Sequence, residues 1–351
     1  MPRLLGILTG GGDCPGLNPA IRAVVLRAAR LGYECLGIKD GWKGMIEGAS
    51  VPLGLAEVEN IVGAGGTILG TSRTNPYKKE GGVESVLANF RQLNLAAVVA
   101  MGGEDTLGVA ARLHAEKKFP VVGVPKTMDN DLSSTDYTFG FDSAASVAMD
   151  AAERLKDTGR SHHRVMVLEV MGRHAGWVAL YAGLAAGADA VLIPEKPYDK
   201  AALISAVKAA HDRKSYALVV ASEAIDMGHD ESEKLDEFGH MILRERGVGE
   251  KIARIIEAAT GLETRAAVIG HIQRGGPPTL FDRILASRAG AAAVDFVHHQ
   301  KFGLMASLRG EKIVGVPLKE ASGALKTIPP DLAGLLDTFC PAGAEAASAH
   351  V

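Results

Sequence analysis

The chain has 351 residues, of which 47% are hydrophobic and 23% are charged. This length and composition exclude an intrinsically disordered protein, and they suffice for one large hydrophobic core or two moderate ones. The formal net charge is −3, and lysine and arginine form no continuous run, which argues against a general nucleic-acid surface. Any phosphate-bearing ligand is therefore expected to be small.

Cysteine use and hydropathy indicate the cellular compartment. Cys14, Cys35 and Cys340 are far apart in the sequence and show no spacing typical of a zinc site or a disulfide framework. The segment Met1–Gly6 is too short and too rich in glycine for a signal peptide, and no apolar run is long enough to span a bilayer. We expect a cytoplasmic protein without a membrane partner.

Short apolar runs alternate with longer amphipathic segments along most of the chain. We expect strands at 4–8, 33–38, 96–101, 121–124, 165–170, 190–193, 217–221 and 266–269. We expect helices at 17–31, 107–117, 141–156, 176–186, 200–213, 240–259 and 281–298. This alternation predicts a doubly wound α/β fold. The charged stretch 226–246 is expected to be a surface excursion.

Polar turns follow two of the expected buried strands. Gly102–Thr106 comes after the first strand, and Pro125–Asp131 comes after the next one along the chain. Because parallel strands end at one edge of a sheet, where α/β folds bind ligands, these turns should lie together. The residues brought together would be Glu104, Asp105, Lys126, Asp129 and Asp131. Such a set suits a metal ion, a phosphate and a general base.

Glycine-rich turns allow a nucleotide or a pyrophosphoryl interpretation. Thr9–Gly16 follows the first strand, but Pro15 stands where the dinucleotide fingerprint has its third glycine. Gly65–Arg73 adds a second flexible turn with a guanidinium group. Exposed amides together with Arg73 are suited to cradle a pyrophosphoryl group whose magnesium is held by acids. The alternatives are an ordinary tight turn for the glycines and a surface salt bridge for Arg73.

A second basic group lies further along the chain. Met171–His174 follows a strand, Glu263–Arg265 precedes one, and Gly270–Gly276 follows that same strand. Arginine favours bidentate contact with phosphate or carboxylate, and the neighbouring glycines let the backbone approach the same ligand. Glu223, which follows the strand at 217–221, is placed either to accept a sugar hydroxyl or to cap the next segment.

Six motifs in this order resemble the phosphofructokinase family. They are Gly-Gly-Gly-Asp-x-Pro-Gly-x-Asn at 10–18, Gly-Thr-Ser-Arg at 70–73, Gly-Gly-x-x-Thr at 102–106, Lys-Thr-x-Asp-Asn-Asp at 126–131, Met-Gly-Arg at 171–173 and Gly-His-Ile-Gln-Arg-Gly-Gly at 270–276. The resemblance implies two doubly wound three-layer α/β/α lobes with mainly parallel sheets. It also implies phosphorylation of fructose 6-phosphate at its 1-hydroxyl. The implied divisions are a phosphoryl-donor lobe at 1–139 plus 272–302, a fructose-6-phosphate lobe at 140–271 plus 303–345, and a peripheral tail at 346–351.

The resemblance assigns roles to individual residues. Asp129 resembles the general base, and Glu104 stands where the family usually has a magnesium-binding aspartate. The residues expected to bind fructose 6-phosphate are Thr127, Met128, Arg164, Met171, Gly172, Arg173, Glu223, Arg265, His271 and Arg274, with Arg173, Arg265, His271 and Arg274 forming the clamp. The residues expected to bind the donor are Gly11, Gly12 and Arg73. Arg164 matches an arginine that family members lend to a neighbouring subunit, which implies a homodimer or homotetramer.

Two positions bear on the phosphoryl donor. Members that use ATP usually carry glycine where this chain has Asp105 and Lys126. A carboxylate at 105 would repel the α-phosphate of ATP by about 4 kcal/mol at roughly 4 Å and an effective dielectric constant near 20. An ammonium at 126 would neutralise charge on a smaller donor. The pair resembles the pyrophosphate-dependent branch, with Asp105 and Lys126 in the catalytic group beside Asp129 and with Mg²⁺ as cofactor.

Three alternatives remain open on the sequence. An ATP-dependent 6-phosphofructokinase shares every motif except Asp105 and Lys126. A non-catalytic sugar-phosphate sensor would keep the arginines without needing Asp129. A dinucleotide-dependent oxidoreductase would need the complete glycine fingerprint, with an acid about 20 residues beyond it.

Overall fold

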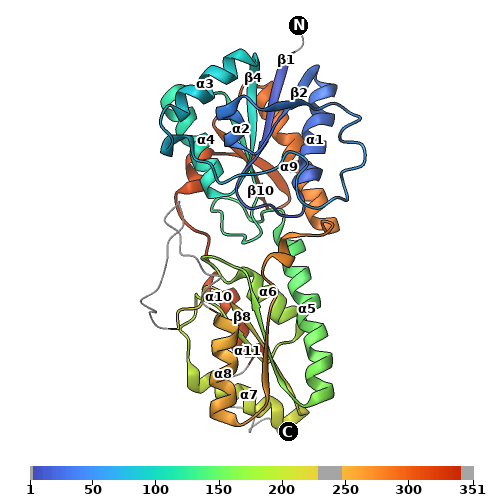
Figure 1. Ribbon diagram of the computed structural model, residues 1–351, viewed down its shortest axis with the longest axis vertical. Coiled ribbons are helices and arrows are strands. Elements are labelled where there is room, and N and C mark those ends of the chain that lie inside the picture. The colour runs from blue at the N-terminus through green and yellow to red at the C-terminus, as the bar shows by residue number, and fades with distance from the viewer. Residues whose placement is uncertain (1–2, 228–246, 341–351) are drawn as a thin grey trace. The chain divides into compact units, whose positions relative to one another are not determined.

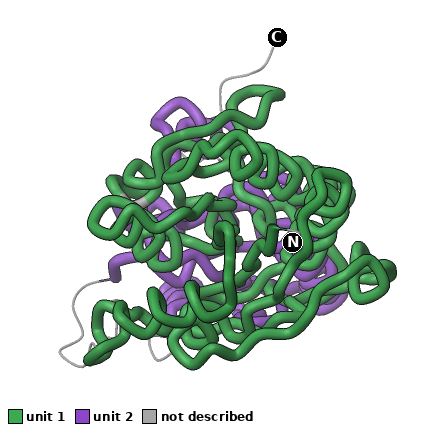
Figure 2. Tube along the Cα trace, turned by 90° about the horizontal axis from the view of Figure 1, so that it is seen from above, with its two compact units in different colours: residues 1–143, 274–326 green, residues 144–273, 327–351 purple. Residues whose placement is uncertain are grey.

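The chain folds into two compact units, each with its own sheet. In the computed structural model, which describes residues 3–227 and 247–340, the first unit comprises 1–143 and 274–326 and the second comprises 144–273 and 327–351 (Figures 1 and 2). The chain therefore passes between the units after Ser143, Gln273 and Lys326. Among the helices in the described ranges, none is long and apolar enough to cross a membrane.

The first unit is built on a seven-stranded sheet in the order β11-β10-β5-β4-β1-β2-β3. Its strands are β1 (Arg3–Thr9), β2 (Tyr33–Ile38), β3 (Ser50–Pro52), β4 (Leu95–Gly102), β5 (Val121–Pro125), β10 (Leu304–Arg309) and β11 (Lys312–Pro317). The strands from β10 to β2 pair in parallel, whereas β3 and β11 close the two edges as antiparallel strands.

Helices cover both faces of this sheet. One face packs against α1 (Leu17–Arg30) and α9 (Leu280–His298), which lie side by side. The other packs against α2 (Trp42–Glu47), α3 (Gly82–Gln92) and α4 (Glu104–Lys117). Successive residues of a strand point to opposite faces, so Val99 packs on the first side and Val98 on the second. Two buried faces explain why the central strands are apolar throughout.

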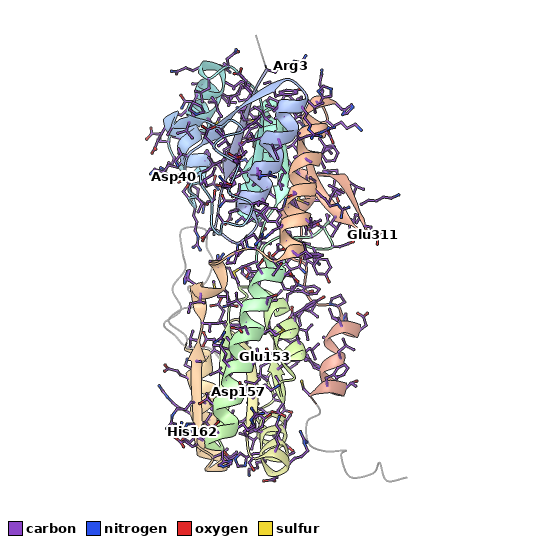
Figure 3. All side chains as sticks on the ribbon, turned by 90° about the vertical axis from the view of Figure 1, so that its right-hand side faces the viewer. Arg3, Asp40, Glu153, Asp157, His162 and Glu311 are labelled. Carbon is purple, nitrogen blue, oxygen red and sulfur yellow. The ribbon has the colours of Figure 1, made fainter. Side chains whose placement is uncertain are left out.

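The second unit has a parallel four-stranded sheet in the order β7-β8-β6-β9. Its strands are β6 (Val165–Val170), β7 (Ala190–Leu192), β8 (Ala217–Ser222) and β9 (Thr264–Val268). The helices are α5 (Phe141–His162), α6 (Trp177–Ala186), α7 (Lys200–Lys214), α8 (Val248–Thr260), α10 (Pro330–Ala333) and α11 (Leu335–Phe339). The core between β6, β8, α7 and α8 is mainly aliphatic. Glu153, Asp157 and His162 follow one another along α5 and are exposed (Figure 3).

Short structures complete the two units. The 3-10 helices η1 (Pro76–Lys78) and η4 (Leu318–Ser322) belong to the first unit, and η3 (Gly270–Arg274) lies where the chain returns to it. The helix α7 begins where Asp199 accepts hydrogen bonds from the amides of Ala201 and Ala202, at 2.8 and 3.0 Å. These contacts satisfy two of the amides that a helix start leaves unpaired.

The α/β class and the parallel sheets are confirmed. All eight predicted strands form, and β3, β10 and β11 are additional to them. The predicted helix at 240–259 begins at Val248 within the described residues; its first part, most of the charged stretch 226–246 and the tail at 346–351 lie outside them.

The observed units differ from the predicted lobes at three boundaries. Residues 303–326, predicted in the second lobe, belong to the first unit, and residues 272–273, predicted in the first lobe, belong to the second unit. For 303–326 the reason is strand pairing: β10 adds to β5 through Met305 and Gly123, and the amide of Gly303 donates to the carbonyl of Val121 at 2.8 Å. A strand pair so distant in sequence leaves no local pattern. The short stretch 140–143 also lies in the first unit.

Candidate active site

Three neighbouring strands of the first unit end at one edge of its sheet. The segments after β1, β4 and β5 are joined there by backbone hydrogen bonds. The amide of Gly10 donates to Met101 O at 2.9 Å, and the amide of Lys126 donates to Gly102 O at 3.0 Å. This confirms that the two acidic turns open at the same edge, beside the first glycine-rich turn.

The second glycine-rich turn lies against the first. The amide of Gly11 donates to Ser72 O at 3.0 Å, and Thr71 Oγ1 donates to Gly11 O at 2.6 Å. Arg73, which is exposed, directly follows this contact. The structure therefore brings two of the predicted donor residues, Gly11 and Arg73, onto adjoining backbone segments.

Lys126 is the buried cation of this edge. Only 3% of it is exposed, and its ammonium donates to the carbonyl oxygen of Gly12. Burial lowers its pKa, and the Asp13 and Asp129 carboxylates act against that shift. Because a buried charge without partners is costly, the contact with Gly12 helps to keep the ammonium beneath the glycine loop.

Arg274, the last residue of η3, contacts the same loop. Its Nη1 donates to Asp13 O at 3.0 Å, and a Cβ placed on Gly12 would lie 2.6 Å from that nitrogen. Glycine at position 12 thus permits the guanidinium to reach the loop. Two cations, Lys126 and Arg274, hold successive carbonyl groups of one turn. The sequence predicts Arg274 in the sugar-phosphate clamp, whereas its observed contact is with the glycine-rich turn Thr9–Gly16, which we call the donor loop because the sequence predicts donor binding there.

The turn that carries Asp129 is held by its own hydroxyl groups. The amide of Asp129 donates to Thr127 Oγ1 at 3.1 Å, and Thr138 Oγ1 donates to Thr127 O at 2.7 Å. Asp129 Oδ1 is buried and has no hydrogen-bond partner among the residues that the structure describes. Met128 is buried beneath the turn. A carboxylate oxygen with free acceptor capacity is what a general base needs.

Carboxylates accumulate around this turn. Burial, together with the neighbouring Asp129 and Glu104 carboxylates, raises the pKa of Asp131 to about 7. Glu104 and Asp105 are exposed in the first turn of α4, where the helix dipole favours negative charge. A divalent cation would relieve the repulsion among these acids, so the site fits Mg²⁺.

No ready-made metal cage exists in the described part of the chain, where no group of three or more His, Cys, Asp and Glu could hold an ion. Mg²⁺ needs none, because it commonly binds through one or two carboxylates, waters and substrate phosphate. Glu104 is the predicted carboxylate, and its exposure leaves it accessible to such a complex.

A second polar cluster lies at the carboxyl edge of the second unit. The turn Met171–Arg173 follows β6, Glu223 follows the adjacent β8, and His271 follows β9 on the other side of β6. The amide of Gly172 donates to Glu223 Oε1 at 3.2 Å, and the amide of Glu223 donates to Val170 O at 2.9 Å. Glu223 therefore supports the turn that precedes Arg173.

Arg164 and Arg265 lie at the opposite edge of that sheet. Arg164 precedes β6 and Arg265 is near the start of β9. Both bind Glu263 Oε1, at 2.8 and 2.5 Å, and the hydrogen bond from Arg164 lowers the pKa of Glu263. At about 3.3 Å per residue, the length of β6 separates them from Arg173 by roughly 16 Å. Within one chain, Arg265 therefore lies with Arg164 and apart from Arg173 and His271.

Comparison with known proteins identifies the family. The family model for phosphofructokinase matches residues 4–297. The chain belongs to the phosphofructokinase family. This phosphofructokinase is 52% identical over 334 residues to a Streptomyces coelicolor protein named pyrophosphate–fructose 6-phosphate 1-phosphotransferase. The aligned region covers 93% of this chain and 97% of the relative.

Overall similarity alone does not separate the two donors. Another Streptomyces coelicolor protein, named ATP-dependent 6-phosphofructokinase 3, is 48% identical over 93% of this chain and 96% of its own length. A crystal structure of a pyrophosphate-dependent phosphofructokinase from Marinobacter aquaeolei shares the fold, with a TM-score of 0.80 at 24% identity over 93% of this chain and 86% of that one. The residues around the donor loop must therefore contribute to the distinction.

Sequence reasoning missed the supports of this phosphofructokinase's Asp129 turn. Asn130 has a positive φ of 51°, and its Oδ1 accepts a hydrogen bond from the amide of Thr138 at 3.2 Å. Lys326 contacts the same oxygen at 3.3 Å. The tolerance of asparagine for positive φ was a readable signal within the Asp-Asn-Asp motif. Lys326 had none, because it lies nearly 200 residues from the turn.

Proposed function

We infer that this phosphofructokinase transfers a phosphoryl group from inorganic pyrophosphate to the 1-hydroxyl of fructose 6-phosphate. The products are fructose 1,6-bisphosphate and phosphate, and the reaction is expected to be reversible. The observation that carries the donor assignment is the buried Lys126 ammonium bound to the donor loop at Gly12, with Asp105 at the adjoining turn. Relatives that are 47–53% identical and named for pyrophosphate use support it.

Asp129 acts as the general base in this proposal. Its unpartnered Oδ1 accepts the proton of the sugar 1-hydroxyl as that oxygen attacks phosphorus. The bond between that phosphorus and the bridging oxygen of pyrophosphate breaks, and inorganic phosphate leaves with the bond electrons. Thr127 and Met128 place the carboxylate beside the acceptor.

The donor site consists of the glycine loop and its cations. The amides near Gly11 and Gly12 together with Arg73 bind the pyrophosphate, and Lys126 neutralises charge that develops during transfer. Glu104 would hold Mg²⁺, and the ion would supply further charge neutralisation for the transferring phosphoryl group. Asp105 disfavours a donor with an additional phosphate and a nucleoside.

The second unit supplies the acceptor site in this proposal. Met171, Gly172, Arg173, Glu223 and His271 bind fructose 6-phosphate, with the arginine directed to its phosphate. Arg274, which contacts the glycine-rich turn through Asp13 O, is the further member of the sugar-phosphate clamp in this proposal. Arg164 and Arg265, at the opposite edge, serve the site of a neighbouring copy, so the enzyme is a homodimer or homotetramer. Its place is the cytoplasm.

The donor assignment is tested by assaying pyrophosphate against ATP. The wild type should use pyrophosphate with a kcat/KM at least about a hundredfold higher, equivalent to roughly 3 kcal/mol. An ATP preference would establish the ATP-dependent alternative. A 48% identical relative is named for ATP use, so this outcome is a real alternative. Absence of turnover with either donor would favour a sugar-phosphate sensor.

The double variant Asp105→Gly with Lys126→Gly sharpens that test. We expect pyrophosphate use to fall at least about tenfold, because a charge-neutralising contact is worth more than 1 kcal/mol. Relative use of ATP should rise. Glu84→Gly is the control, because Glu84 is an exposed acid in the first turn of α3, away from the donor loop. Undiminished pyrophosphate use in the double variant contradicts the assignment.

A further inference from the structure

Lys326 contacts the Asp129 turn from a distant part of the chain. Its amide donates to Asp131 O at 2.8 Å, and its ammonium donates to Asn130 Oδ1 at 3.3 Å and to the carbonyl oxygen of Asp136. Leu325, the preceding residue, forms an antiparallel bridge with Leu132. Two neighbouring residues thus attach the segment at 325–326 to both ends of the turn at 130–136.

The ammonium lies in a partly enclosed place. Its nitrogen is 5.6 Å from the centre of the Tyr137 ring, and burial lowers the pKa of Lys326 to about 8. The charged groups that act on it are Asp136, Arg309 and Asp131. Lys326 is only partly exposed, whereas nearby Lys319 is exposed. The contrast sets Lys326 apart from an ordinary surface lysine.

Asn130 links this contact to Asp129. Its left-handed backbone conformation, with φ of 51°, determines the direction in which the chain leaves Asp129. The Asn130 side chain is held by two donors, the amide of Thr138 and the ammonium of Lys326. Removing the ammonium frees one side of the asparagine carbonyl and releases the carbonyl of Asp136. The turn then keeps the hydrogen bond from the Thr138 amide to Asn130 Oδ1 and loses the hydrogen bonds from the Lys326 ammonium.

We propose that Lys326 is a positioning residue for Asp129, acting through Asn130 to hold the carboxylate in line with the sugar hydroxyl. The proposal rests on the function inferred above. In this role Lys326 acts through Asn130 and not by binding the substrate itself. Its effect is on the alignment of the base, and alignment errors of about 1 Å can lower a rate about a hundredfold.

The test is the variant Lys326→Met. The backbone bond to Asp131 survives the change, since it needs only the amide, so the loop retains one anchor. We expect kcat to fall about 10- to 100-fold while the KM values for both substrates stay within about threefold and the melting temperature changes little. Lys326→Gln, which can still donate to Asn130, should lie between Lys326→Met and the wild type. Lys319→Met is the matched control and should behave as the wild type.

A double-mutant cycle separates positioning from general support. In an Asp129→Asn background, measured at high enzyme concentration, Lys326→Met should cause no further loss of turnover. Additive losses, or an unchanged kcat in the single variant, overturn the positioning role and leave the proposed function intact. Full turnover of Asp129→Asn itself overturns the base assignment and this inference with it.

Discussion

The two units arrange their polar motifs differently around the same kind of parallel sheet. In the first unit, the motifs follow three neighbouring strands, β1, β4 and β5, and all lie at one edge. In the second unit, the motifs flank both ends of β6 and β9. Motifs that follow adjacent parallel strands converge, whereas motifs on either side of one strand are separated by its length.

The two arrangements suit different roles, namely contacts within one chain in the first unit and contacts with another copy at the far edge of the second. Residues at the first unit's edge are joined by short contacts within one chain, as Lys126 and Arg274 show at the glycine loop. Arg164 and Arg265 share Glu263 at the far edge of the second sheet. Two guanidinium groups held at an exposed edge are suited to an interface with another copy.

The largest expected effect concerns the base in the first unit. Asp129→Asn keeps the size of the side chain and removes the proton acceptor, so kcat should fall about 10³-fold or more with substrate binding largely retained. Steady-state kinetics and binding of fructose 6-phosphate by calorimetry measure the two parts. If turnover is unchanged, catalysis does not depend on this carboxylate, and the general base cannot be assigned to this edge of the first unit.

The second prediction concerns the two edges of the second unit. Arg164→Ala, Arg265→Ala and Arg173→Ala should each raise the KM for fructose 6-phosphate about tenfold or more, since each removes a charge-assisted contact. Mixing subunits distinguishes them. Asp129→Asn co-expressed with Arg164→Ala or Arg265→Ala should regain activity, because one mixed site combines an intact base with an intact arginine from its neighbour.

Arg173→Ala is the matched control for that complementation. If Arg173 and Asp129 both serve the site of their own chain, as we propose, a mixed pair of Arg173→Ala and Asp129→Asn subunits contains no intact site and should stay inactive. Two outcomes would contradict this division of the arginines. Activity could be restored by Arg173→Ala, which would mean that Arg173 serves a neighbouring site. Alternatively, Arg164→Ala and Arg265→Ala could fail to restore activity, which would mean that these two arginines do not serve a neighbouring site.

A smaller effect is expected at the donor loop. Gly12→Ala places a methyl group 2.6 Å from Arg274 Nη1, so the guanidinium must move away from Asp13. The KM for pyrophosphate should rise by about threefold to tenfold, as expected for about 1 kcal/mol of lost interaction. Gly323→Ala is the control, because its methyl group would meet no atom closer than 3.7 Å. Equal kinetics of the two variants would show that Arg274 does not shape the donor loop.

The last prediction concerns stability and not activity, at the point where the chain first leaves the first unit. Buried Asp282 accepts hydrogen bonds from Ser143 N and Oγ at 2.8 and 2.6 Å, yet burial raises its pKa to about 6. A raised carboxyl pKa means that folding favours the protonated form. The contribution of this group to stability therefore falls as pH rises from about 4 to about 6, by up to about 3 kcal/mol.

Asp282→Asn removes this titration and can keep one oxygen for Ser143. The difference in unfolding free energy between variant and wild type should shift in favour of the variant as pH rises through that window, as measured by urea unfolding from pH 4 to pH 7. The exposed Glu311→Gln serves as the control (Figure 3). A pH-independent difference would show that the titration of Asp282 does not contribute to the pH dependence of the unfolding free energy.

Much of the site in the first unit could be predicted because its chemistry is local to each strand end. The buried run 95–101 followed by Gly-Gly-Glu-Asp indicated a strand and a polar turn without any further knowledge. The same reasoning could not identify Lys326 or Thr138. Their contacts with the Asp129 turn form only when later segments of the chain fold back against it. It also failed for 303–326, where pairing with β5 decides the unit.

The sequence by itself determined the alternating α/β pattern, the family and the candidate residues for its chemistry, because periodicity and short motifs are local properties of a chain. Only the tertiary structure decided which end of β6 each arginine occupies and which residues support Asp129. Strand order, register and contacts between distant segments arise from packing of the whole unit, and no short stretch of sequence encodes them.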